Sequence, residues 1–120
     1  MSVLLRHASA GDRSAWAGDD FHRPLDKKWR RQAKEIAAAL AADDVRRVVS
    51  SPYVRCVQTV EPLAAALGLE VEIDDRLAEG GDGSARALFE EPGVVACTHG
   101  DVIFELLGYG LKKAQYVVLG

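Results

Sequence analysis

Short apolar runs recur along the chain, and most of them end at polar residues, glycine or proline. The run at residues 2–6 is nearly continuous, which is typical of a strand covered on both faces, and further short runs lie at residues 45–49 and 94–97. Residues 69–73 alternate between apolar and charged side chains, as in a half-buried or edge strand. Residues 114–119 add a last apolar run. The pattern predicts a short strand at each of these positions.

Helical spacing of apolar residues appears between the predicted strands. Residues 27–42 follow Asp26, a suitable N-cap, and place lysine and arginine opposite an apolar face. That face is formed by Trp29, Ala33, Ile36, Ala37 and Leu40. Shorter helices are predicted over residues 84–91 and 101–108.

Another helix is predicted over residues 52–67. Ser51 is a suitable N-cap, and Pro52 suits the first helical position because its fixed φ and missing N–H cost nothing there. Gly68 can adopt the left-handed conformation that ends a helix.

The alternation of strands and helices predicts the fold class. We expect an α/β three-layer sandwich with a mostly parallel central sheet and helices on both faces. The length suits a single domain over residues 1–120. The segment 8–25 has no periodicity, and a loop of this length in a compact domain usually has a functional role.

Composition narrows the function classes. The net charge of −3 argues against a general nucleic-acid-binding surface. No apolar run approaches the ~20 residues of a membrane span, and the first residues lack the pattern of a secretion signal. Cys56 and Cys97 fall inside predicted elements, so both are expected to be reduced thiols in a cytoplasmic protein.

Polar groups follow three of the predicted strands. Arg6 and His7 end the first run, a Ser-Ser-Pro turn leading to Arg55 follows the second, and His99 follows the run at 94–97. The carboxyl ends of parallel strands share one edge of a sheet, where ligands bind. We therefore expect these side chains to converge.

The converging groups predict an anion site. Two arginines and a helix N-terminus suit phosphate oxygens, and two imidazoles allow one nucleophile and one group that stabilises transferred charge. A carboxyl group is then needed to protonate the leaving oxygen and activate water. Glu79 is the first candidate for that role, and Asp101 is the alternative, although a residue at a helix start is more often a cap.

Three motifs, LLRHA, SSPYVRCVQT and CTHGD, resemble the signatures of the histidine phosphatase superfamily, whose members have a phosphoglycerate-mutase-like fold. RLAEG resembles the segment that contains the proton donor. The short length and the RPL sequence are most similar to the small SixA-like phosphohistidine phosphatases. The loop AGDRSAWAGDD is also similar to the phosphatase half of Nudix–phosphatase fusions that act on nucleotides.

The resemblance implies a role for each candidate residue. His7 would be the phosphorylated nucleophile, Arg6, Arg55 and His99 would complete the phosphate pocket, and Glu79 would be the proton donor. No metal or other cofactor is implied. Ala8 stands where the family usually has glycine.

Several functions remain open. The resemblance favours a monomeric phosphatase acting on a phosphohistidine protein, and the alternative is a nucleotide or other small phosphomonoester. In that alternative Trp16 would stack on a base, while Arg13 or Arg23 would hold a further phosphate. A phosphate-binding module without turnover is a third possibility. A metal site formed by His7, His22 and His99 is disfavoured, because the neighbouring arginines would repel a cation.

Overall fold

The computed structural model describes residues 2–8, 17–25, 27–41 and 43–119. The side chains of Lys28 and Trp29 lie outside this description, as does Asp26, so the predicted N-cap and the inward position of Trp29 remain predictions.

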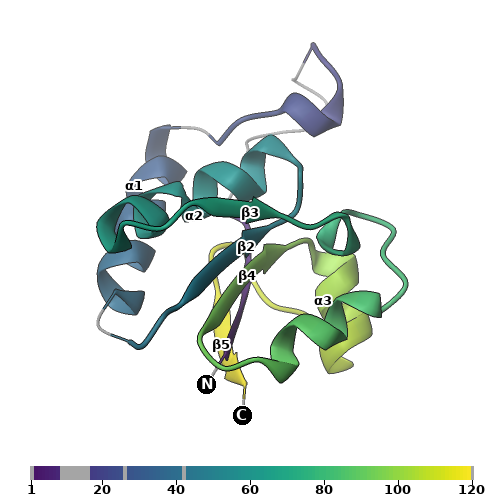
Figure 1. The fold of residues 1–120 in the computed structure, drawn as a ribbon. Helices are drawn as coiled ribbons and strands as arrows, with labels where there is room; N and C mark the ends of the chain where they lie inside the picture. Colours follow the sequence, from purple (N-terminus) through teal and green to yellow (C-terminus); the bar gives the residue numbers. More distant parts are fainter. Residues whose placement is uncertain (1, 9–16, 26, 42, 120) are drawn as a thin grey trace.

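The described residues form a central sheet whose strand order is β3-β2-β4-β1-β5 (Figure 1). Its strands are β1 (Ser2–Arg6), β2 (Arg47–Ser50), β3 (Val71–Ile73), β4 (Val94–Thr98) and β5 (Tyr116–Leu119). The pairs β1–β4, β2–β4 and β2–β3 are parallel, and β5 runs antiparallel to β1. The mostly parallel sheet predicted from the sequence is confirmed.

Helices cover both faces of the sheet, as Figure 1 shows. On one face, α1 (Lys27–Leu40) and α2 (Val54–Leu67) pack through Ile36, Leu40, Val60 and Leu63 against strand residues such as Val3. The other face is covered by α3 (Gly100–Leu107) and the 3₁₀ helix η4 (Ser84–Glu90). The three-layer α/β architecture is therefore confirmed, although residues 84–90 form a 3₁₀ helix.

The register of the sheet aligns the carboxyl ends of β1, β4 and β2. Arg6 pairs with Thr98, and Ser50 pairs with Cys97, so β1, β4 and β2 end side by side. All of β4 is buried, which explains its continuous apolar run, since a strand between two helical layers has no polar face.

The start of α2 corrects one prediction. The helix begins at Val54, and its N-cap is Tyr53, which makes no side-chain capping hydrogen bond. Ser51 is not the N-cap, and Pro52 lies outside the helix, because the extended backbone of Tyr53 (ψ 136°) delays the first helical turn. Gly68 ends the helix at φ 68°, as predicted.

No helix within the described ranges is long and apolar enough to span a bilayer.

Candidate functional site

The ends of β1, β2 and β4 bring four predicted site residues together. Arg6 ends β1 and His7 follows it, Arg55 lies in the first turn of α2, and His99 directly precedes α3. The His7 and His99 rings lie 5.2 Å apart between centroids. His7, Arg55 and His99 are all buried. The convergence expected from strand order is therefore present.

The orientation of His7 is set by one short contact. Its Nδ1 lies 2.7 Å from the carbonyl oxygen of Ala8. A carbonyl only accepts, so Nδ1 carries the hydrogen and Nε2 keeps its lone pair. Burial, with a smaller contribution from Arg55, lowers the pKa of His7 to about 4. The imidazole is thus neutral near pH 7 and can act as a nucleophile through Nε2.

His99 is held by Ser51 and by an aromatic neighbour. Its Nε2 lies 2.8 Å from the Ser51 hydroxyl, and the Tyr53 ring centroid lies 4.7 Å from its own. Burial, followed by the influence of His7, lowers its pKa to about 3. Ser51, expected to cap a helix, instead holds this imidazole.

Arg6 lies across the first residue of α3. Its Nη1 donates to the carbonyl of Leu111 at 2.7 Å, and its buried Nε has no partner among the described residues. A Cβ at Gly100 would lie 3.2 Å from Cζ of Arg6, which is tighter than normal packing. Glycine after His99 therefore gives the guanidinium room to lie against the backbone.

Arg55 is fully buried and meets two carboxylates. Its Nη2 lies 3.0 Å from Oδ2 of Asp20 and 2.6 Å from Oε1 of Glu79, and its Nη1 donates to the Asp20 carbonyl at 2.9 Å. The buried Nε has no partner among the described residues. The charge of Arg55 is thus compensated by two carboxylates, and a ligand anion would compete with them for its Nη atoms.

Glu79 lies at the site, and Asp101 fixes the loop that contains it. Oε1 of Glu79 is 3.5 Å from Nδ1 of His99. Oδ2 of Asp101 accepts from the backbone N–H of Gly80 at 2.7 Å, and Thr98 donates through Oγ1 to the carbonyl of Leu77 at 2.5 Å. These bonds hold the loop against the end of β4. Between the two candidates for the proton donor, Glu79 is the one that contacts Arg55.

Sequence reasoning missed Asp20. Its Oδ1 accepts from Nε of Arg23 at 3.0 Å, while its Oδ2 contacts Arg55. Asp20 begins the 3₁₀ helix η2 (Asp20–His22) and lies three positions before Arg23. This spacing could have suggested the pair. The Arg23 side chain is 7% exposed and bonded to Asp20.

Thr59 was also missed. Its Oγ1 accepts from the N–H of Ala8 at 3.0 Å and donates to the carbonyl of Arg55 at 2.7 Å. The residue therefore ties the segment after His7 to the first turn of α2. Thr59 is the last residue of the motif SSPYVRCVQT, but the motif alone does not indicate this contact with Ala8.

The remaining predicted residues lie outside the described ranges or away from the converging groups, apart from the buried cysteines. Arg13 and Trp16 lie outside the described residues. His22 is exposed and pairs with Asp19 at 2.7 Å. The described residues contain no group of three or more His, Cys, Asp or Glu side chains arranged to hold a metal. Cys56 and Cys97 are free and buried.

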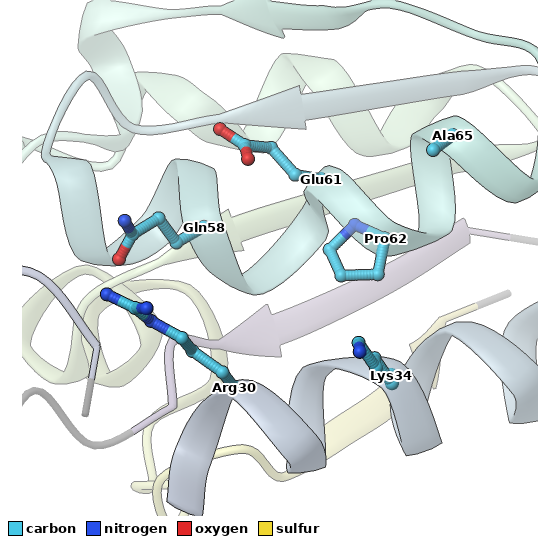
Figure 2. A pocket seen from close by; sticks show the side chains of 6 residues that line it. All are labelled: Arg30, Lys34, Gln58, Glu61, Pro62 and Ala65. Carbon is cyan, nitrogen blue, oxygen red and sulfur yellow. The ribbon is translucent and has the colours of Figure 1, made fainter. Parts of the chain in front are cut away.

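A separate hollow of about 440 Å³ lies between α1 and α2, and Figure 2 shows the residues that line it. Two exposed cations of α1, Arg30 and Lys34, form one wall, and α2 forms the other. The α2 lining consists of Gln58, Glu61, Pro62 and Ala65. None of the converging residues lines this hollow, so it is distinct from the site at the strand ends.

Comparisons with known proteins agree with the motifs. The model described as histidine phosphatase superfamily (branch 1) matches residues 2–93, which confirms the resemblance seen in the sequence. An 8-oxo-(d)GTP phosphatase from Mycolicibacterium smegmatis is 38% identical over 94% of this chain and 38% of its own length. A 2,3-bisphosphoglycerate-dependent phosphoglycerate mutase from Thermoplasma acidophilum is 32% identical over 72% of this chain and 44% of its own.

The chain therefore spans less than half of each of these two curated relatives. Among solved structures, the protein histidine phosphatase SixA complexed with tungstate is similar, with a TM-score of 0.72 and 25% identity. The match covers 94% of this chain and 83% of that one.

Proposed function

Because this chain belongs to the histidine phosphatase superfamily, we propose that it hydrolyses phosphate esters through a phosphohistidine intermediate on His7. The observation that carries the proposal is the 2.7 Å contact between Nδ1 of His7 and the Ala8 carbonyl. This contact leaves Nε2 unprotonated, and burial keeps the ring neutral by lowering its pKa to about 4. His7 is thereby prepared to attack phosphorus.

Arg6, Arg55 and His99 hold the phosphoryl group during the reaction. The guanidinium groups of both arginines are planar donors that match phosphate oxygens. The free N–H groups at the starts of α2 and α3 favour an anion at the same place. These donors stabilise the charge that develops on the transferring group.

Glu79 supplies the proton transfers. In the first step, Nε2 of His7 forms the N–P bond, the P–O bond to the leaving group breaks, and the Glu79 carboxyl protonates the leaving oxygen. In the second, the Glu79 carboxylate takes a proton from water, the water oxygen attacks phosphorus, and the N–P bond breaks. Phosphate and the Glu79 carboxylate compete for Nη2 of Arg55.

The test is hydrolysis of 4-nitrophenyl phosphate by the unmodified protein and by His7→Ala. We expect His7→Ala to abolish turnover, and acid-labile, alkali-stable phosphate to label only the unmodified protein. Arg30→Ala is the matched control, since Arg30 lines the separate hollow. Activity that survives in His7→Ala would refute the nucleophile assignment, and phosphate binding without turnover would favour a binding module.

For the physiological substrate, we propose a small phosphate ester of the nucleotide class. Its support is the 38% identity with a relative named as an 8-oxo-(d)GTP phosphatase. The position of Glu79 beside Arg55 and His99 adds to this, since an alkoxide leaving group needs a proton donor.

A phosphohistidine protein is the second candidate. It is supported by the structural similarity to SixA at 25% identity. Phosphoimidazole leaves readily, so this reaction depends little on Glu79. Parallel assays of a nucleoside monophosphate and a phosphohistidine protein with unmodified enzyme would decide between the candidates, because the true substrate has the larger kcat/KM.

A further inference from the structure

A row of aromatic rings leads from the nucleophile to the surface. The ring centroids of His7 and His99 are 5.2 Å apart, those of His99 and Tyr53 are 4.7 Å apart, and those of Tyr53 and Phe21 are 5.1 Å apart. Phe21 is 38% exposed, and its ring centroid also lies 4.9 Å from that of the exposed His22. Large exposed aromatic side chains beside a reactive site are suited to contact a ligand.

Phe21 directly follows Asp20, the η2 residue whose carboxylate contacts Arg55. Its neighbour Asp20 and the proposed proton donor Glu79 both contact the same nitrogen, Nη2 of Arg55. The leaving oxygen must approach Glu79 to receive its proton. The group attached to that oxygen therefore extends towards the η2 turn.

The distances between the rings bear on how long a leaving group must be to reach Phe21. The Tyr53 ring lies one ring-to-ring step of 4.7 Å from His99. Phe21 lies a further step of 5.1 Å away. A sugar between the phosphate and the ring supplies that additional reach.

We propose that Phe21 is a stacking platform for the base of a nucleotide whose phosphate is transferred to His7. This specificity role rests on the proposed phosphatase function. Base stacking on an aromatic side chain is tolerant of base identity, so the platform selects for the presence of a base rather than for one base.

The test compares GMP with ribose 5-phosphate, which has the same phosphate ester and sugar but no base. We expect the unmodified enzyme to prefer GMP in kcat/KM, and Phe21→Ala to lower the GMP to ribose 5-phosphate ratio roughly tenfold. Phe21→Trp should preserve the ratio, since tryptophan also stacks. Phe104→Ala, at an aromatic residue on α3 that is 59% exposed, is the matched control and should leave the ratio unchanged.

A structural role for Phe21, in which it only supports Tyr53 or His22, would change both substrates together. Equal losses for GMP and ribose 5-phosphate in Phe21→Ala would therefore overturn the proposal. So would equal kcat/KM values in the unmodified enzyme, or hydrolysis of 4-nitrophenyl phosphate without hydrolysis of GMP. Those three outcomes leave the His7 phosphatase intact, whereas the absence of any His7-dependent hydrolysis would overturn the proposed function itself.

Discussion

Nη2 of Arg55 lies 2.6 Å from Oε1 of Glu79. The arginine proposed to bind phosphate and the carboxyl group proposed to donate the proton therefore form an ion pair. Arg55 is fully buried, while the Glu79 side chain is 31% exposed. A phosphate group bound at Arg55 would therefore lie next to the Glu79 carboxyl group. In the proposed reaction, phosphate binding and proton transfer are coupled through this one guanidinium nitrogen.

This pair predicts a leaving-group dependence for Glu79→Gln. The amide keeps the shape but cannot donate or accept the proton, so hydrolysis of alkyl phosphates should slow by roughly 10²–10⁴-fold. Hydrolysis of phosphohistidine should slow far less. Steady-state kcat/KM values for both substrates measure the difference, and Glu61→Gln, a change at the separate hollow, is the control. Equal slowing of the two reactions would contradict the donor role.

The two buried imidazoles predict a loss of stability in acid. Their pKa values are lowered to about 4 for His7 and about 3 for His99, against 6.5 for the unfolded chain. Between these values the unfolded state binds more protons, so the free energy of unfolding falls as pH drops below about 6.5. Each imidazole contributes at most about 1.4 kcal/mol per pH unit, until the pH passes below its folded pKa.

Urea denaturation at several pH values between 7 and 4 measures the slope of the free energy of unfolding against pH. His7→Asn should make it shallower by removing one of the two groups. His22→Asn is the control, because His22 is exposed and lies outside the pocket. An unchanged slope in His7→Asn would show that His7 does not become harder to protonate on folding.

Gly100→Ala should damage catalysis more than folding. The added Cβ would meet Cζ and Nη2 of Arg6 at 3.2 Å, so the guanidinium must shift by a few tenths of an ångström. A shift of this size in a phosphate ligand should lower kcat/KM on the order of tenfold. Gly110→Ala is the matched control, since a Cβ there meets no atom within 4 Å. Full activity in Gly100→Ala would mean that Arg6 does not need its observed position.

Asp20→Asn tests the carboxylate that bridges Arg23 and Arg55. Losing this charge leaves two buried guanidinium groups less well compensated, so the free energy of unfolding should fall by roughly 1–3 kcal/mol. The pocket also becomes more positive, and inorganic phosphate should therefore inhibit more strongly.

Asp19→Asn provides the neighbouring control, because Asp19 is exposed and pairs with His22. Chemical denaturation and the inhibition constant of phosphate measure the two effects. Weaker inhibition in Asp20→Asn would show that the carboxylate positions Arg55 more than it opposes the anion.

The sequence by itself determined which elements form and which of their ends meet. Arg6, His7, Arg55 and His99 could be found because each ends a strand or lies shortly after one, and parallel strands end at one edge of the sheet. Only the tertiary structure decided how these groups are held. Asp20 and Phe21 belong to a loop without periodicity, where no local rule relates sequence to position.

Ser51 shows the same limit. Local preference made it a helix cap, but its hydroxyl is 2.8 Å from an imidazole that lies 48 positions further along the chain. Likewise, the proton on Nδ1 of His7 follows from where the Ala8 carbonyl lies after β1. Strand order depends on hydrophobic burial, which is read from pattern, whereas hydrogen-bond partners depend on distances that exist only once the chain has folded.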